Sequence, residues 1–303
     1  MTNLERLARR LERELPGLEL RRGEPMSRHT TFRVGGPAEL MALPEDEGQL
    51  CAAARLAAEE GVLPLTVGNG SNLLVDDAGL DGFVLKTVPK VGTITGAGNT
   101  LTAGAGATLA QLAVEAANRG LAGLEFAHGI PGSVGGGVVM NAGAYGGELC
   151  QVVRQVRAMD RQGRVRELRG EECDFSYRHS LFSGGEWLIL GAAVELTPDD
   201  AQAIRSRMVE LMARRREKQP LEYPSAGSTF KRPAGHFAAA LIEQCGLKGL
   251  RVGGAQVSEK HAGFVINTGG AACRDILELM DQVRERVFRE TGVTLEPEVK
   301  YVR

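Results

Sequence analysis

Residues 129–147 read Gly129-Ile-Pro-Gly-Ser-Val-Gly-Gly-Gly-Val-Val-Met-Asn-Ala-Gly-Ala-Tyr-Gly-Gly147 and hold eight glycines without one charged side chain. Glycine lets a main chain approach a ligand closely and adopt positive φ, so that successive N–H groups converge on an anion such as a phosphate or pyrophosphate. A run of tight turns or a bulged strand is the alternative, since glycine also marks bulges and corners. The stretch predicts a loop that binds a large polar ligand through its backbone.

Two shorter loops share this character. Gly68-Asn-Gly-Ser-Asn72 follows the strand-like run 63–67 and precedes a second short apolar run at 73–76. Ala103-Gly-Ala-Gly-Ala-Thr108 opens a helical pattern, whose N-terminus would add free N–H groups and partial positive charge. Three such loops suit a long diphosphate cofactor better than a mononucleotide.

The two best-known phosphate motifs are missing from the sequence. No Gly-Lys-Ser or Gly-Lys-Thr follows a glycine run, which argues against a kinase or a P-loop ATPase. Leu73 stands where a dinucleotide fingerprint beginning at Gly68 needs its third glycine, so this is not the first turn of a Rossmann fold.

Composition indicates an ordinary soluble protein. The chain has 303 residues, 43% of them hydrophobic and 24% charged, enough for two or three domains. A net charge of −2 provides no excess of positive charge for binding nucleic acid or an anionic membrane. The longest apolar run, 188–194, is too short to span a bilayer. Residues 3–15 have helical spacing among charges rather than the apolar core of a signal peptide. We expect a cytoplasmic protein that is a monomer, since no coiled-coil heptad occurs.

Cysteine and histidine spacing predicts no metal site. The five cysteines form no C-x-x-C, and the five histidines form no H-E-x-x-H. Buried, reduced thiols are expected.

Periodicity and capping residues predict four further helices: 45–61, from about 198 to 217, 236–245 and 274–289. Gly246 and Gly292 stand where helix C-caps belong. The last residues alternate like a strand that could return to an earlier sheet.

Three polar spots interrupt apolar patterns, at 177–180, 224–231 and 295–299. Ser228 lies outside any G-x-S-x-G elbow, which makes a serine hydrolase a poor fit. Taken alone, Ser228 can be a turn or cap residue, Arg178 a surface ion pair and Glu298 a solvated strand charge. The basic cluster Arg214–Arg216 with Lys218 suits either a helix C-terminus or a bound diphosphate.

In their order along the chain, the motifs resemble the UDP-N-acetylenolpyruvoylglucosamine reductase family, the MurB-type flavoenzymes of peptidoglycan precursor synthesis. The resemblance runs from about residue 29 to the C-terminus. It rests on His29-Thr-Thr-Phe-Arg-Val-Gly-Gly-Pro37, Gly68-Asn-Gly-Ser-Asn-Leu73, the 129–147 loop, Phe175-Ser-Tyr-Arg178, Ser225-Ala-Gly-Ser-Thr-Phe-Lys231, Gly253-Gly-Ala-Gln-Val257 and Glu296-Pro-Glu-Val299.

This resemblance implies an α+β fold in which a two-domain FAD-binding unit of the vanillyl-alcohol-oxidase (PCMH) type precedes a C-terminal α+β substrate domain. The implied boundaries are 1–90 for the first FAD-binding subdomain, joined by a C-terminal strand at 293–303, then 91–198 for the second and 199–292 for the substrate domain. FAD is the implied cofactor. NADPH is the implied reductant of UDP-N-acetylglucosamine enolpyruvate.

The family pattern also implies roles for individual residues. It makes Ser228 the proton donor and places Arg178 and Glu298 beside the enolpyruvyl group, where Glu298 would need a raised pKa to donate a hydrogen bond. Substrate-binding positions are Tyr145, Lys218, His261 and Lys300. Cofactor-binding positions are Val67, Gly68, Asn69, Gly70, Ser71, Asn72, Leu73, Gly129, Ile130, Pro131, Gly132, Ser133, Gly135, Gly136, Asn141, Ala142 and Gly143.

Two departures qualify the resemblance. Many relatives have Phe-Lys-Asn-Pro after the donor serine, whereas this chain has Phe230-Lys-Arg-Pro233. The segment 180–187 is short, as in the short-loop (type II-like) branch of the family. A FAD-dependent 2-hydroxy acid or alcohol dehydrogenase of the same flavin superfamily, and a noncatalytic flavin-nucleotide-binding protein, remain alternatives.

Overall fold

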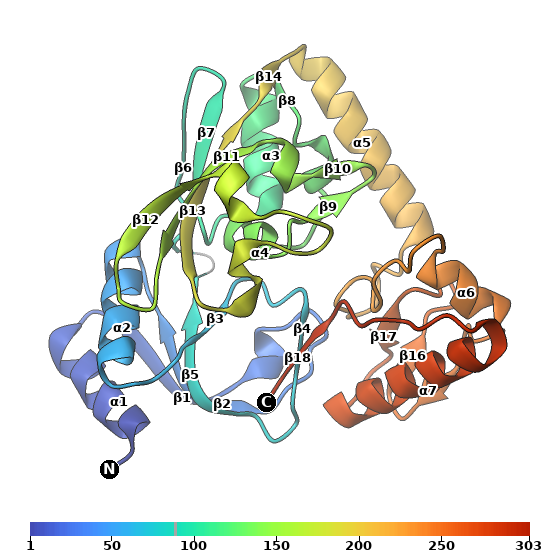
Figure 1. The fold of residues 1–303 in the computed structure, drawn as a ribbon, viewed down its shortest axis with the longest axis horizontal. Helices are drawn as coiled ribbons and strands as arrows, with labels where there is room; N and C mark the ends of the chain where they lie inside the picture. The colour runs from blue at the N-terminus through green and yellow to red at the C-terminus, as the bar shows by residue number, and fades with distance from the viewer. Residues whose placement is uncertain (88–89) are drawn as a thin grey trace. The chain divides into compact units, whose positions relative to one another are not determined.

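The computed structural model describes residues 1–87 and 90–303 and divides the chain into two compact units (Figure 1). The first unit comprises Met1–Arg22, Leu40–Asn69 and Gly82–Arg214, and the second comprises Gly23–Glu39, Gly70–Asp81 and Arg215–Arg303. Each unit is therefore assembled from segments that are far apart in the sequence. Residues 88 and 89, which fall in the predicted 1–90 region, lie outside the described residues.

A four-stranded sheet and two helices form one part of the first unit. The sheet has the order β1-β2-β5-β3, made by β1 (Glu19–Pro25), β2 (Pro37–Leu43), β5 (Leu80–Lys86) and β3 (Leu65–Val67). Strands β1, β2 and β5 each continue across a boundary between the units. Helices α1 (Asn3–Glu14) and α2 (Glu47–Glu59) begin at the N-caps Thr2 and Asp46, and their apolar faces share one core with strand residues such as Leu40 and Leu85.

A five-stranded antiparallel sheet forms the other part of the first unit. Its order is β12-β11-β13-β7-β6, made by β12 (Val165–Arg169), β11 (Val153–Met159), β13 (Leu188–Glu195), β7 (Thr100–Gly104) and β6 (Ile94–Ala97). Helices α3 (Leu109–Asn118) and α4 (Val134–Val139) contribute their apolar side chains to the core of this sheet. Helix α3 follows directly on the predicted loop at 103–108, whereas α4 lies inside the stretch 129–147, so that only part of this predicted loop is irregular.

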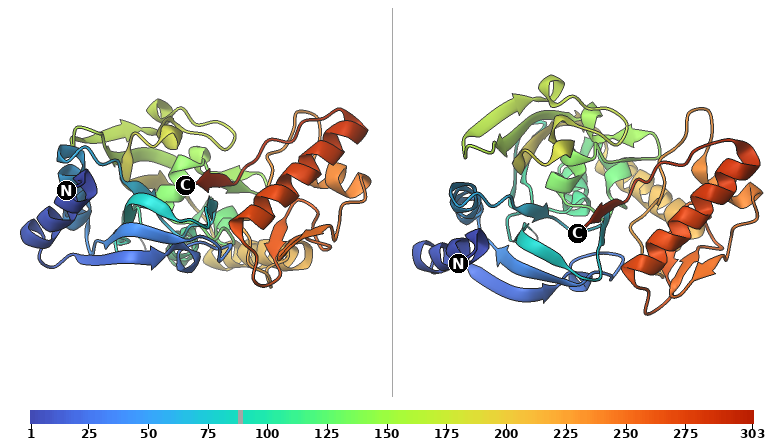
Figure 2. Two further views of the ribbon diagram at one scale, coloured as in Figure 1. Left: turned by 90° about the horizontal axis from the view of Figure 1, so that it is seen from below. Right: turned by 60° about the horizontal axis from the view of Figure 1, so that its bottom comes forward.

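The second unit has its own core, built around the long helix α7 (Cys273–Thr291). This helix packs against β15 (Arg251–Val252) and β16 (Ala255–Val257), which form a three-stranded sheet with β17 (Val265–Asn267) (Figure 2). Helix α6 (Ala238–Gln244) also packs on α7. The C-terminal strand β18 (Lys300–Val302) pairs in parallel with β4 (Leu73–Val75).

One long helix and several short elements complete the chain. Helix α5 (Ala201–Lys218) contains the boundary between the units after Arg214. Two small antiparallel pairs are β8 (Leu121–Ala122) with β14 (Thr197–Pro198), and β9 (Gly143–Ala144) with β10 (Gly147–Glu148). Single 3-10 turns occur at Met26–Arg28, Glu125–Ala127, Leu149–Gln151, Gly170–Cys173 and Leu181–Gly184.

The structure confirms the predicted helices. Each of α2, α5, α6 and α7 begins and ends within a few residues of the span expected from periodicity, and Gly246 and Gly292 have φ of 66° and 73° at the ends of α6 and α7. All five cysteines are free thiols, and four of them are buried. The division at residues 90 and 198 stays a prediction.

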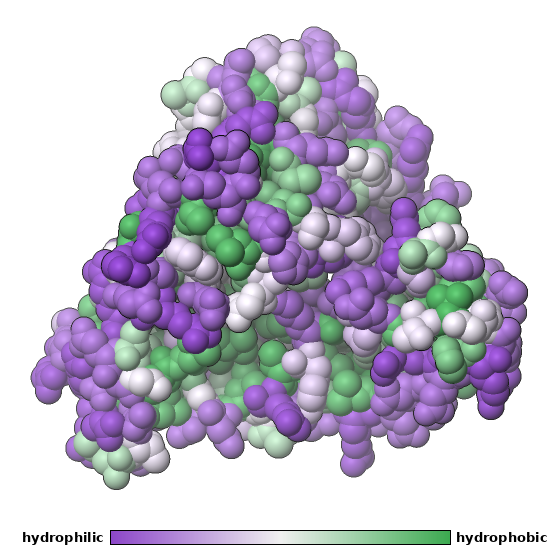
Figure 3. Space-filling view, in the orientation of Figure 1, coloured by the Kyte–Doolittle hydropathy of each residue, from purple (hydrophilic) through white to green (hydrophobic). Residues whose placement is uncertain are grey.

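Charged and polar residues cover most of the face shown in Figure 3. Within residues 1–87 and 90–303, no helix combines the length and the apolar composition needed to cross a membrane.

Candidate active site

The predicted glycine loop at residues 68–72, hereafter the first glycine loop, contains a run of backbone amides that bond no acceptor in the described part of the protein. The loop follows β3, and among the described residues the amides of Gly68, Asn69, Gly70 and Ser71 have no hydrogen-bond acceptor in the protein. Gly70 has φ of 63°, and a Cβ at this position would lie 2.0 Å from the carbonyl oxygen of His29. Buried or half-buried amides without an acceptor are rare, so this loop is suited to an anionic ligand.

The predicted glycine loop at residues 129–147, hereafter the second glycine loop, contacts residues 68 and 69 of the first glycine loop within the first unit. Asn69 Nδ2 donates to the carbonyl oxygen of Pro131 at 2.9 Å, and a Cβ on Gly68 would lie 2.1 Å from Ser133 Oγ. In the described chain, the amides of Gly132 and Ser133 also have no protein acceptor. The two loops, predicted separately, thus present free amides next to one another.

Gly68 must lack a side chain for this contact to form. Ser133 Oγ accepts from the amide of Gly136 and so caps α4. In Gly68→Ala the new methyl group would displace that hydroxyl, and we expect the free energy of unfolding to fall by about 1–2 kcal/mol. Urea unfolding measures the change. Gly82→Ala in β5 is the matched control, because a Cβ there meets no atom within 4 Å, and it should be neutral or slightly stabilising. Equal stability of the two variants would count against the contact.

The prediction of a third anion-binding loop at 103–108 is wrong. Every amide from residue 104 to residue 108 already donates within the protein, to the carbonyl oxygens of Thr93, Leu190, Val91 and Gly104 and to Gln111 Oε1. The carbonyl oxygens of Ala105 and Ala107 accept from the amides of Gly135 and Val134. This loop therefore supports the second glycine loop instead of binding a ligand with its own amides.

Arg178 lies beside the end of the second glycine loop. One of its guanidinium nitrogens donates to the carbonyl oxygen of Gly143 at 3.0 Å, and the guanidinium lies 5.0 Å from the centre of the Tyr177 ring. The fully buried Asn141 ties the two segments together, because its Nδ2 donates to the carbonyl oxygen of Ser176 and to Glu148. The Asn141 side chain is thus committed to holding the Arg178 segment, and its backbone amide donates to the carbonyl oxygen of Val138.

Ser228 and Glu298 lie on adjacent segments of the second unit. The amide of Glu298 donates to the carbonyl oxygen of Thr229 at 2.9 Å, and Phe230 pairs with Pro297. Asn72 joins them, since its Nδ2 donates to the carbonyl oxygen of Glu298 at 3.0 Å across 226 residues of sequence. The fold therefore brings two of the three predicted catalytic residues next to the end of the first glycine loop. Arg178 belongs to the first unit, and its approach to this pair stays a prediction.

The four predicted substrate-binding residues occupy different settings. Tyr145 is 44% exposed in the turn between β9 and β10, and Lys218 is exposed at the end of α5. His261 Nδ1 accepts from the amide of Gly263, so a neutral ring carries its proton on Nε2 and can donate from there; burial lowers the pKa of His261. Lys300 pairs with Leu73, and burial, followed by the charge of Lys231, lowers its pKa.

Arg232, which stands where the resemblance leads us to expect asparagine, stacks on an aromatic ring. Its guanidinium lies 4.5 Å from the centre of the Phe237 ring, which is 61% exposed. The departure thus creates an exposed cation–π pair.

Sequence reasoning missed Lys86. This residue ends β5, where it pairs with Val67, and its ammonium donates to the carbonyl oxygen of Gly68 although the side chain is only 9% exposed. Burial lowers its pKa to about 8. A lysine that closes the apolar run Phe83-Val-Leu-Lys86 was the pattern that could have revealed it.

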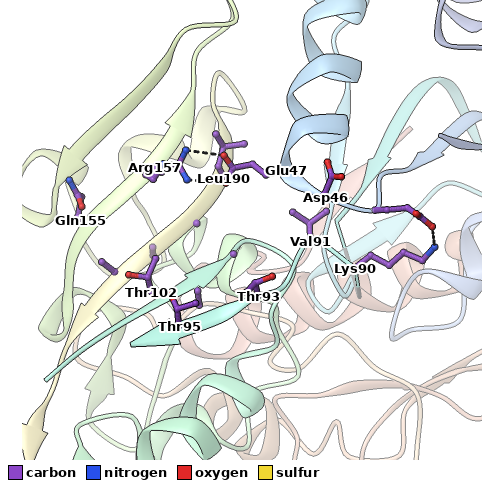
Figure 4. Close-up of a pocket in the computed structure, with 16 residues that line it drawn as sticks. Asp46, Glu47, Lys90, Val91, Thr93, Thr95, Thr102, Gln155, Arg157 and Leu190 are labelled. Carbon is purple, nitrogen blue, oxygen red and sulfur yellow. Dashed lines mark hydrogen bonds and ion pairs between the residues drawn. The ribbon is translucent and has the colours of Figure 1, made fainter. Parts of the chain in front are cut away.

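A pocket of about 290 Å³ in the first unit lies elsewhere (Figure 4). Its lining includes Thr93, Thr102 and Leu190, and two ion pairs, Arg157 with Glu47 and Lys90 with Glu45, lie at its edge. None of the predicted site residues lines it.

Comparison with known proteins identifies the family. The model of the FAD binding domain matches residues 38–169, and that of the UDP-N-acetylenolpyruvoylglucosamine reductase C-terminal domain matches residues 219–302. The UDP-N-acetylenolpyruvoylglucosamine reductase of Agathobacter rectalis is 48% identical over 301 residues, which cover 95% of this chain and 96% of that protein. This chain belongs to the UDP-N-acetylenolpyruvoylglucosamine reductase family.

Two further members of this reductase family are also similar to this chain over nearly its whole length. The reductase of Syntrophomonas wolfei is 46% identical over 288 residues, covering 95% of this chain and 96% of that protein. The crystal structure of the reductase (MurB) from Thermus caldophilus is similar with a TM-score of 0.81 and 36% identity, covering 94% of this chain and 99% of that chain. The comparisons confirm the family predicted from the motifs, and with it the α+β fold in which a FAD-binding region precedes the reductase C-terminal domain.

Proposed function

We propose that this protein reduces the enolpyruvyl group of UDP-N-acetylglucosamine enolpyruvate to the lactyl ether of UDP-N-acetylmuramate, with FAD as cofactor and NADPH as reductant. The proposal rests on the juxtaposition of the segments that hold Ser228, Glu298 and Asn72. These segments lie in a chain that is 48% identical, over 95% of its length, to the UDP-N-acetylenolpyruvoylglucosamine reductase of Agathobacter rectalis.

The free amides support FAD as the ligand of the two glycine loops. FAD carries a diphosphate, and the amides of Gly68, Asn69, Gly132 and Ser133 are donors without a protein acceptor among the described residues. Anions are commonly held by such converging backbone N–H groups. We assign the other cofactor-binding positions predicted above, within 67–73, 129–133, 135–136 and 141–143, to the same cofactor.

Bound FAD would supply hydride transfer, taking a hydride from NADPH and delivering it to the terminal alkene carbon of the substrate. The protein's part is charge stabilisation followed by protonation. Arg178 stabilises the negative charge that develops on the substrate carboxylate, through charge-assisted hydrogen bonds. Ser228 donates a proton to the basic carbon of the resulting enolate, and a protonated Glu298 donates a hydrogen bond to the same oxyanion.

Contacts to the diphosphate and sugar of the substrate complete the proposal. We assign them to Tyr145, Lys218, His261 and Lys300. His261 suits this role because its accepting Nδ1 leaves Nε2–H as a donor, and the two lysines supply positive charge. The division into two FAD-binding subdomains, 1–90 and 91–198, and a substrate domain, 199–292, belongs to the same proposal.

Anaerobic spectroscopy of the purified protein tests the function. We expect a flavin spectrum that NADPH bleaches and that UDP-N-acetylglucosamine enolpyruvate then restores. Bleaching by a 2-hydroxy acid without NADPH would instead identify a dehydrogenase. A flavin that neither reductant bleaches would identify a binding protein without turnover.

A further inference from the structure

Lys86 places a buried positive charge behind the first glycine loop. The residue ends β5, its side chain is 9% exposed, and its ammonium donates to the carbonyl oxygen of Gly68, the first residue of the loop. No ion pair joins Lys86 to a carboxylate in residues 1–87 and 90–303. Burying an ammonium with so few partners is unfavourable, and burial lowers its pKa to about 8.

The hydrogen bond of Lys86 fixes the orientation of one peptide group. In a trans peptide the C=O and the following N–H point in opposite directions. Because Lys86 holds the Gly68 carbonyl, the amide of Asn69 points away from the ammonium and has no acceptor among the described residues. The Asn69 side chain is bonded to Pro131, so the same peptide lies where the two glycine loops meet.

We propose that Lys86 is a positioning residue for the diphosphate of FAD: it holds the Gly68–Asn69 peptide so that the Asn69 amide faces the diphosphate, and its charge offsets that of the anion. This inference rests on the proposed function, which makes FAD the ligand of the loop. It also explains why an unpaired ammonium is kept in the interior, since bound diphosphate supplies the missing negative charge.

Three substitutions separate the donor from the charge. Lys86→Met removes both, Lys86→Gln keeps a donor without charge, and Lys86→Arg keeps both. FAD affinity is measured by titrating each variant, freed of flavin, and following flavin fluorescence. We expect Lys86→Met to weaken FAD binding about 10- to 100-fold and Lys86→Gln to weaken it less. Lys86→Arg should keep most of the affinity of the unmodified protein. Lys90→Met is the matched control, because Lys90 is exposed and paired with Glu45, and it should bind FAD like the unmodified protein.

Urea unfolding without flavin distinguishes positioning from a merely structural role. Because the unpaired ammonium is unfavourable in the empty protein, Lys86→Met should be at least as stable as the unmodified protein while binding FAD more weakly. A Met variant that is less stable or does not fold contradicts the inference, because the ammonium would then support the fold. FAD affinity unchanged in both Met and Gln variants also overturns it, whereas an unmodified protein that binds no FAD overturns the proposed function itself.

Discussion

Replacing Ser228 with alanine is expected to leave reduction by NADPH nearly intact and to slow reoxidation by UDP-N-acetylglucosamine enolpyruvate about 10²- to 10⁴-fold. Only the second half-reaction needs the proton that Ser228 donates, so only that step should lose rate. Ser228 is exposed, and the local pairing is made by its neighbours Thr229 and Phe230, so the fold should survive the change. Anaerobic stopped-flow absorbance of the flavin measures the two half-reactions separately.

Ser225→Ala is the matched control for Ser228. It removes a hydroxyl from the same loop three residues earlier, and we expect both half-reactions to keep their rates. Equal slowing of both half-reactions in Ser228→Ala would remove Ser228 from its assigned role as proton donor.

Replacing Arg178 with alanine should slow the same second half-reaction about 10²- to 10³-fold. The guanidinium is assigned to the charge that grows on the substrate carboxylate, and the loss of one such donor usually costs this much. Arg178→Lys should recover only part of the rate, because an ammonium keeps the charge but lacks the planar two-point geometry. Single-turnover reoxidation measures both variants.

Arg178 also needs a structural control, because it bonds Gly143 and has φ of 55°. Flavin content and the rate of reduction by NADPH provide this control, and both should be preserved in Arg178→Lys. Reoxidation at an unchanged rate in Arg178→Ala would contradict the assignment.

The helices were predictable because local patterns determine them. Apolar spacing, N-caps such as Asp46 and C-cap glycines such as Gly292 are readable without knowing the tertiary structure. The last strand was only partly predictable: the alternation extends from residue 292, but only Lys300–Val302 pairs with another strand, because pairing depends on where β4 lies.

The glycine loops show where reading of the sequence fails. The loops at 68–72 and 103–108 look alike in composition. Within the described residues the amides of residues 68–71 have no protein acceptor, whereas all five amides from Gly104 to Thr108 are bonded. The acceptors that occupy those amides include Leu190 of β13 and Thr93, which directly precedes β6. Composition predicts that a backbone is accessible, but only the full count of hydrogen bonds tells whether its amides are available.

The candidate site depends on contacts between distant segments. Ser228, Glu298 and Asn72 were nominated through a family resemblance, since nothing in their spacing predicts that Asn72 bonds the backbone of Glu298. Lys86 was overlooked because a single lysine at a strand end is usually solvated. Its meaning became visible only when its side chain proved buried against Gly68.

We propose that a guanidinium, a hydroxyl and a carboxyl surround the double bond that is reduced. A crystal structure of the protein with FAD and UDP-N-acetylglucosamine enolpyruvate tests it most directly. We predict the enolpyruvyl group within hydrogen-bonding reach of Arg178, Ser228 and Glu298, with the FAD diphosphate on the amides of residues 68–71. A complex in which these three side chains face different surfaces, or in which the diphosphate lies away from that loop, would contradict the account.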